Sequence, residues 1–150
     1  SGKALDKINY KKTKMIKGWY EKSNLDTLRK KDENIDFILD DFLLKIVDKE
    51  KNVVMDSWTL PYLTKKGVKI WLSADVKERA KRLSLRNNMT YDVALKHLKK
   101  KDSFSKTHFK KLYGFYLGKD LSVFDYVVDT NNKSVKDVEK EVYDIIKKHK

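Results

Sequence analysis

Residues 68–78, VKIWLSADVKE, place a short apolar run directly before the start of a helix. Val68 to Ser73 contains a single charged residue, Lys69, which is typical of a strand buried in a parallel sheet. Asp75-Val76-Lys77-Glu78 has the pattern of a capping box, in which the first and fourth side chains bond free amides at the start of a helix. The stretch therefore predicts a strand that is followed at once by a helix.

The rest of the chain repeats this alternation of strand and helix. Apolar runs at Asn52–Asp56 and Phe124–Val128 are predicted to be further strands. Apolar spacing and capping patterns predict helices over Asp32–Lys51, Asp75–Asn88, from Thr90 through the lysines at 99–101, over Ser103–Tyr116, and from Ser134 to the end. This alternation predicts an α/β fold with a parallel sheet flanked by helices. A length of 150 residues fits one domain, residues 1–150.

The composition points to anionic partners without identifying them. The net charge is +13 at pH 7, which favours nucleotides, nucleic acid or an acidic membrane surface. However, only four of the 35 basic residues are arginines, and lysines spread along a whole chain also arise from genome composition or a salt-tolerant surface. The lack of cysteine excludes disulfides and thiolate metal sites. Because neither an apolar run of membrane-spanning length nor a signal peptide is recognisable, we expect a cytoplasmic protein without a membrane partner.

Polar clusters follow the predicted strands, at the edge where open parallel sheets bind ligands. They are Asp56-Ser57-Trp58, Ser73-Ala74-Asp75 and Asp129-Thr130-Asn131. Each cluster is also consistent with a loop that caps the next helix, and for Ser73–Asp75 this is the preferred interpretation. Arginines at positions 79, 82 and 86 share one helix face because their spacing is three and four residues. A row of guanidinium groups suits phosphate binding, and a solvated charged face explains the same spacing.

Six segments together resemble a known enzyme family. They are Asn52–Asp56, Val68–Ser73, Glu78–Arg82, Lys111–Gly114, Leu121–Asp125 and Val127–Thr130. In order and spacing, from about residue 32 to the end, they resemble the archaeal-type cytidylate kinases, which are P-loop nucleoside monophosphate kinases. The resemblance implies a P-loop-kinase-like sheet, a helical lid at about residues 88–118, and ATP-dependent phosphorylation of CMP or dCMP with Mg²⁺.

The resemblance also implies roles for particular residues. Asp56 stands where the family has an acidic residue near the monophosphate and the metal ion. Arg82 and Arg86 lie on the helix that leads into the lid, where arginines contact ATP. Thr130 and Asn131 lie in the loop near the ATP base.

Other positions depart from the family pattern. In the arginine-rich lid pattern, Asp102 is kept, whereas Lys101 preserves the charge but not the guanidinium fork, and these two are the catalytic candidates. The family follows its acidic residue with Gly-Arg, and that arginine holds the monophosphate. Here Ser57 and Trp58 occupy those positions, and an indole at the monophosphate site can stack on a base but cannot replace a cation.

The N-terminal residues depart most. A P-loop requires G-x-x-x-x-G-K-[ST] after a strand, whereas Lys3 follows Ser1-Gly2 and precedes Ala4. We therefore expect the first strand and the P-loop to be missing, either because the domain is degenerate or because Ser1-Gly2 is a tag remnant before a truncated helix. Lys3 remains a nucleotide-binding candidate on the strength of the resemblance.

Two functions remain open from the sequence. The first is a cytidylate-kinase-like nucleotide-binding domain that takes CMP or dCMP and ATP, with impaired phosphotransferase activity. The alternative is a non-catalytic basic module that binds RNA or a ribonucleoprotein assembly. For this alternative, the densest basic stretch, Lys96–Lys111, is interleaved with Phe104, His108, Phe109 and Tyr113. Proteins that bind single-stranded nucleic acid combine basic and aromatic side chains in this way. In a kinase lid, the same apolar residues would only pack helices together.

Overall fold

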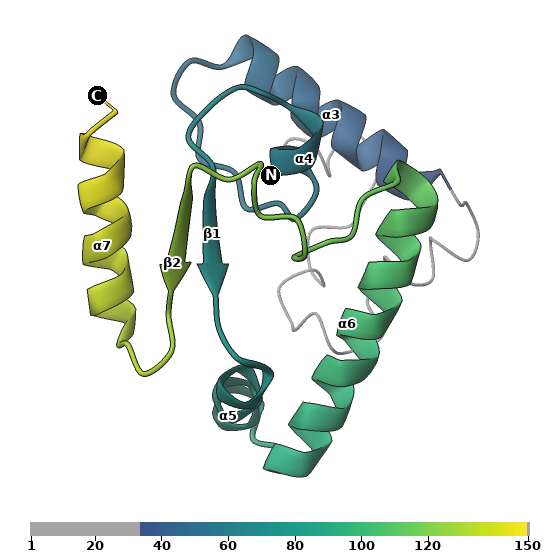
Figure 1. Cartoon of the computed structure of the whole chain (residues 1–150), viewed down its shortest axis with the longest axis vertical. Helices are drawn as coiled ribbons and strands as arrows, with labels where there is room; N and C mark the ends of the chain where they lie inside the picture. Colours follow the sequence, from purple (N-terminus) through teal and green to yellow (C-terminus); the bar gives the residue numbers. More distant parts are fainter. Residues whose placement is uncertain (1–33, 150) are drawn as a thin grey trace. The chain divides into compact units, whose positions relative to one another are not determined.

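The computed structural model describes residues 34–149 and divides into two compact units, with the boundary between residues 66 and 67 (Figure 1). The predictions for Lys3, for the P-loop and for a first strand lie outside the described residues. They stay predictions.

The first unit contains α3 (Ile35–Lys49) and the single-turn helix α4 (Leu60–Leu63). Pro61 stands in the first turn of α4, where the N–H that proline lacks would have no partner within the helix. The hydroxyl of Thr59 donates to the carboxylate of Asp40 at 2.6 Å, and both side chains are buried. This bond joins α3 to the turn that precedes α4.

The predicted strand at Asn52–Asp56 is wrong, because this segment forms neither strand nor helix in the described part of the chain. Val54, at its centre, has an exposed fraction of 93%. A strand needs partners for its backbone N–H and C=O groups, and neither β-strand of the described residues pairs with it. An apolar run alone was therefore insufficient evidence for a strand.

The second unit is built on two parallel strands, β1 (Ile70–Ser73) and β2 (Tyr126–Asp129). The register pairs Ile70 with Tyr126 and Ser73 with Asp129, so both strands end at the same edge. Val128 is 2% exposed and is the most deeply buried large side chain of the pair. The predicted parallel α/β arrangement is thus confirmed for this unit, with strands slightly shorter than expected.

The connection from β1 to β2 contains two helices that pack against each other, α5 (Val76–Asn87) and α6 (Tyr91–Tyr113). Their contact buries small and medium apolar side chains, among them Ala80, Leu83 and Ala94. Asn88 ends α5 in the left-handed conformation, with φ of 50°, which is a common way to stop a helix. The hydroxyl of Thr90 then accepts from the amide of Val93 and begins α6.

Helix α6 is a single helix of 23 residues, and the prediction of two helices meeting near Ser103 is wrong. The sequence around this point contains neither glycine nor proline, so nothing interrupts the backbone ladder. The carboxylate of Asp102 also bonds Arg79 of α5, which holds the middle of α6 against its neighbour.

The last helix, α7 (Val135–Lys147), packs on β2 and begins with the predicted capping box. The Ser134 hydroxyl accepts from the Asp137 amide, and the Asp137 carboxylate accepts from the Ser134 amide. By contrast, Asp75 occupies the N-cap of α5 without forming a capping box. Its amide donates to Asn131, and the Glu78 carboxylate is bonded to Arg82, so both groups of the predicted box have other partners.

Every helix within residues 34–149 is too short or too polar to cross a lipid bilayer.

Candidate functional site

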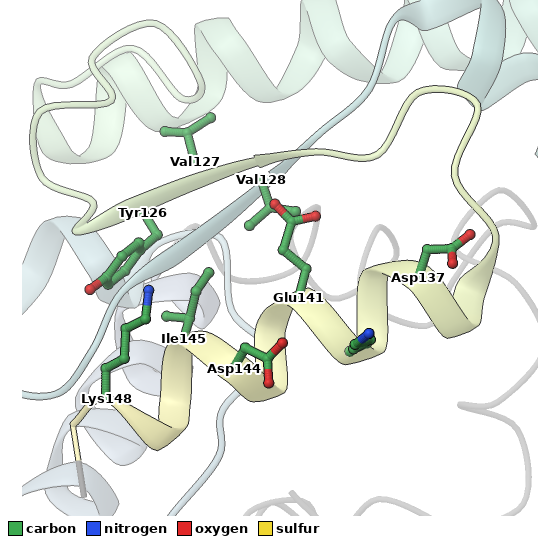
Figure 2. A pocket seen from close by; sticks show the side chains of 9 residues that line it. Tyr126, Val127, Val128, Asp137, Glu141, Asp144, Ile145 and Lys148 are labelled. Atoms are coloured by element: carbon green, nitrogen blue, oxygen red, sulfur yellow. The ribbon is translucent and has the colours of Figure 1, made fainter.

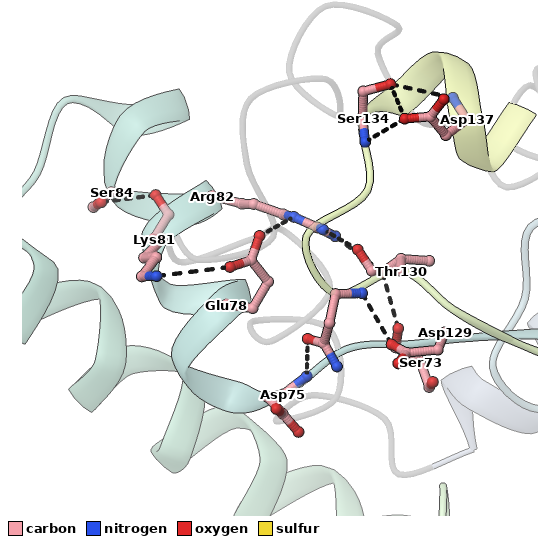
Figure 3. Close-up of polar contacts among 11 residues, drawn as sticks. Ser73, Asp75, Glu78, Lys81, Arg82, Ser84, Asp129, Thr130, Ser134 and Asp137 are labelled. Atoms are coloured by element: carbon pink, nitrogen blue, oxygen red, sulfur yellow. Dashed lines mark hydrogen bonds and ion pairs between the residues drawn. The ribbon is translucent and has the colours of Figure 1, made fainter.

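Two of the three predicted polar clusters meet beyond the carboxyl ends of β1 and β2 (Figure 3). The amide and the hydroxyl of Thr130 both donate to the carbonyl oxygen of Ser73, at 2.8 and 2.9 Å. The side-chain oxygen of Asn131 accepts from the amide of Asp75 at 3.0 Å. These bonds join the loop after β2 to the start of α5, which fixes the edge where parallel sheets bind ligands.

Arg82 of α5 reaches into this edge and is held there from two sides. Its Nε donates to Oε1 of Glu78 at 3.0 Å, and its Nη1 donates to the hydroxyl of Thr130 at 3.0 Å. Its Nη2 donates to the carbonyl oxygen of Thr130. A guanidinium has five N–H groups, so two remain for a ligand, and the side chain is still 42% exposed. The guanidinium is therefore oriented in advance, beside a carboxylate that offsets part of its charge.

The other two arginines of the predicted row serve different purposes. Arg79 forms a two-point ion pair with Asp102 of α6, with N–O distances of 3.1 and 2.5 Å. Arg86, one turn beyond Arg82, is exposed and forms no hydrogen bond or ion pair among the described residues. Lys101 is half-buried beside Asp102. The three arginines lie on one face of α5, but each guanidinium group has a different environment.

A hollow of about 160 Å³ adjoins the Arg82 site and contains groups that the sequence did not single out. Its lining is Asp75, Lys77, Glu78, Lys81, Asn131 and Asn132. Asn132 takes the left-handed conformation, with φ of 54°, which turns the loop toward α7. Lys77 and Lys81 are four residues apart and so share a face of α5, a signal that the sequence already contained. Together they give the edge cationic groups besides Arg82.

A larger hollow of about 450 Å³ runs along β2 and α7 (Figure 2), and its charges do not suit a phosphate. Three carboxylates and two lysines line it: Asp137, Glu141, Asp144, Lys140 and Lys148. Hydrogen bonds from the Ser134 hydroxyl and amide lower the pKa of Asp137 below its ordinary value, so this group is negative at neutral pH. None of the described residues that were predicted to bind a nucleotide lies in this hollow.

The third predicted cluster, Asp56-Ser57-Trp58, lies in the first unit. Asp56 is exposed, and Trp58 has an exposed fraction of 37%. Between them, the Ser57 hydroxyl accepts from the amides of Thr59 and Leu60 at 3.3 and 3.2 Å. Ser57 thus shapes the turn before α4, in agreement with the alternative interpretation of this cluster as a loop that caps the next helix. The described residues contain no group of three or more carboxylate, histidine or cysteine side chains suited to a metal ion.

The parallel pair of strands and the bonded polar cluster beyond its carboxyl ends give the second unit the α/β arrangement in which ligands commonly bind at that edge. The family model described as "Cytidylate kinase-like family" matches residues 3–132. The chain belongs to this family, and the prediction of a cytidylate-kinase relative is confirmed.

Similar archaeal proteins support the assignment. A cytidylate kinase of Saccharolobus islandicus is 31% identical over 119 residues, which are 78% of this chain and 62% of that protein. One of Methanocaldococcus jannaschii is 36% identical over 97 residues, 61% of this chain and 54% of that protein. One of Sulfurisphaera tokodaii is 31% identical over 122 residues, 79% of this chain and 67% of that protein. The chain thus spans between about half and two thirds of the length of these relatives. No solved structure matches it.

Proposed function

We propose that this chain is a cytidylate-kinase-like nucleotide-binding domain, in which the edge beyond β1 and β2 contacts the phosphates and base of ATP. Membership of the family is the observation that carries the proposal. The contacts of Arg82 support it, because two of its N–H groups stay available in a fixed orientation. A preset guanidinium loses less conformational entropy when it binds an anion than a mobile lysine does.

In this proposal, Arg86 and Asn131 extend the contact surface around Arg82. Arg86 is exposed one turn along α5 and has no competing partner among the described residues. The side-chain oxygen of Asn131 accepts a hydrogen bond from the Asp75 amide, which fixes the loop. The side-chain amide of Asn131 therefore has a defined orientation. Thr130 acts through Arg82, because its buried hydroxyl positions the guanidinium. Lys101 and Asp102 are proposed lid residues of the same reaction, with Asp102 held by Arg79.

The proposed acceptor is CMP or dCMP, bound near Asp56 and Trp58 in the first unit. Asp56 is an exposed carboxylate, and Mg²⁺ is commonly held by one or two carboxylates together with phosphate oxygens. A single carboxylate therefore fits that ion, which would neutralise phosphate charge during transfer. Trp58 offers a half-exposed indole where the family offers a cation, so we propose weak CMP binding and impaired phosphoryl transfer.

Calorimetric titration with CMP, and separately with ATP and Mg²⁺, tests this proposal. Trp58→Arg should raise CMP affinity roughly 10-fold or more, the value of a hydrogen bond to a charged group, while ATP affinity stays unchanged. Ser57 should be left in place, because it bonds two amides of its own turn. Trp58→Lys is the matched variant that supplies charge without a fork and should gain less.

For the ATP site, Arg82→Lys should weaken ATP binding by several-fold while CMP binding stays unchanged. Lys136→Ala, an exposed substitution on α7, is the control and should change neither. If Trp58→Arg left CMP affinity unaltered, residues 56–58 would not be a monophosphate site. If Arg82→Lys left ATP affinity unaltered in a folded protein, the edge beyond β1 and β2 would not be the ATP site.

A further inference from the structure

Helix α6 has the largest net positive charge of the described helices, one unit more than the shorter α5. It contains seven lysines and two aspartates. One of the two, Asp102, is paired with Arg79, which reduces its effect on the lysines. Six of the lysines are exposed: Lys96, Lys99, Lys100, Lys106, Lys110 and Lys111.

These exposed lysines share one side of α6. The buried residues of the helix are Ala94, Ser105 and Phe109, which define the packed side because they are separated by 11 and 4 residues, close to whole turns. The exposed lysines fall on the remaining surface at intervals of three, four and seven residues. From Lys96 to Lys110 the helix rises about 21 Å, which is enough to follow several phosphates of an extended strand.

Exposed aromatic rings accompany the lysines. Phe104, one turn after Lys100, is 51% exposed, and its ring stacks on His108 with centroids 5.1 Å apart. Just beyond the end of α6, Tyr116 is 44% exposed. Lys110 Nζ lies 4.6 Å and Lys119 Nζ 5.2 Å from the centroid of the Tyr116 ring. An exposed ring with two cations close to it offers a stacking surface next to two phosphate-binding groups.

Helix α7 provides an internal comparison. Tyr143 is 53% exposed, and Lys147 Nζ lies 4.6 Å from its ring centroid, so the local pair resembles that of Lys110 and Tyr116. However, α7 contains four acidic residues and three lysines. A polyanion would meet repulsion there, so a tyrosine with a neighbouring lysine is insufficient without the surrounding charge.

We infer that the exposed lysines of α6, with Phe104 and Tyr116, form a binding surface for single-stranded nucleic acid. The lysines neutralise phosphates, and the two rings stack on unpaired bases. Phosphates and base faces are common to RNA and DNA, so this surface binds both. The inference is independent of the proposed kinase activity, because it rests on the exposed side of α6 rather than on the edge that holds Arg82.

Fluorescence anisotropy with a labelled 12-nucleotide oligouridylate tests the inference, with the natural chain at several KCl concentrations from about 50 to 200 mM. The logarithm of the association constant should fall linearly with the logarithm of salt, by roughly 0.7 per phosphate neutralised. Replacing Lys99, Lys100 and Lys106 with alanine should reduce this slope by about 2. Alanine favours helix, so the variant should keep its fold, which circular dichroism checks. Replacing Lys136, Lys140 and Lys147 of α7 is the matched control and should leave the slope unchanged.

A second pair of variants separates stacking from charge. Tyr116→Ala should weaken binding of the oligouridylate by roughly 5- to 100-fold, whereas Tyr116→Phe should retain it. Tyr143→Ala on α7 should have no effect. An abasic 12-mer has the same phosphates without bases, so its weaker binding should not respond to Tyr116→Ala. Oligothymidylate should behave as oligouridylate does.

Four outcomes would overturn the inference. The first is the absence of binding at about 50 mM KCl. The second is an equal change of slope from the α6 and α7 triple variants, which would show that only net charge matters. The third is equal affinity for the abasic and the normal oligomer. The fourth is tighter binding of a 12-base-pair RNA duplex than of the single strand, since paired bases cannot stack on Phe104 or Tyr116.

Discussion

Thr130→Val tests the central contact of the edge beyond β1 and β2. Thr130 is 5% exposed, and its hydroxyl donates to Ser73 and accepts from Arg82. Valine has nearly the same shape, so the substitution removes two hydrogen bonds without opening a large cavity. The carbonyl oxygen of Ser73 keeps the hydrogen bond from the Thr130 amide at 2.8 Å. Arg82 is 42% exposed, so water can replace the hydroxyl as its hydrogen-bond partner. The loss of unfolding free energy should therefore be about 1–2 kcal/mol, between the values for one and two net hydrogen bonds.

Urea unfolding measures this loss as a lower midpoint with an unchanged slope. Hydrogen exchange should show faster exchange of amides in residues 126–131, because the loop after β2 is less tightly held. Thr107→Val is the matched control, because among residues 34–149 the exposed Thr107 hydroxyl bonds only the Ser103 carbonyl of its own helix, at 3.2 Å. Its effect should stay within about 0.5 kcal/mol. If the two valine variants were equally stable, the Thr130 hydroxyl would contribute nothing that water does not replace.

Three further predictions concern the same unit. Double-mutant cycles of Arg79→Ala and Asp102→Ala should give a coupling of about 0.5–1 kcal/mol in urea unfolding, because both side chains are more than one third exposed; additive losses would contradict a direct contribution of the pair. Asp137→Asn should remove a part of the stability that is present near neutral pH and is lost as pH falls through the folded pKa, since bonds from Ser134 lower that pKa; an unchanged acid limb of the stability profile would refute this. Gly118→Ala should lower the free energy of unfolding by more than about 1 kcal/mol, because Gly118 has φ of 71° and a Cβ there would lie 3.3 Å from the ring of Trp71 in β1. A thermal unfolding midpoint equal to that of the unsubstituted protein would contradict this prediction.

The sequence predicted those features that depend on neighbours along the chain. The strands at 68–73 and 124–128 appear as β1 and β2 with ends shifted by up to two residues. The capping box at Ser134 forms because both of its members lie in one turn. The box at Asp75 fails because the competing partner, Asn131, is 56 residues away in sequence, and a local pattern carries no information on such a partner.

The candidate site shows the same limit. Spacing placed Arg79, Arg82 and Arg86 on one face of α5, but it could not assign Arg79 to Asp102 or Arg82 to Thr130, which are 23 and 48 residues distant. Tyr116 was not predicted as a contact because its two lysines are six and three residues away on opposite sides of a turn. Only the backbone path after α6 brings the three together.

Because α5 and α6 are joined by a short connection, a change in the angle between them would move the far end of α6 the most. The 23 residues of α6 extend about 34 Å, and a rotation of this helix relative to α5 would have its pivot at the three-residue connection, 88–90, that joins the two. A rotation of about 10° at that pivot would move the far end by about 6 Å. Asp102, which forms the ion pair with Arg79, lies near the midpoint of α6 and would move by about half of that distance. A small change of the angle between α5 and α6 would thus be amplified at the C-terminal end of α6, and the ion pair of Asp102 with Arg79 would oppose it.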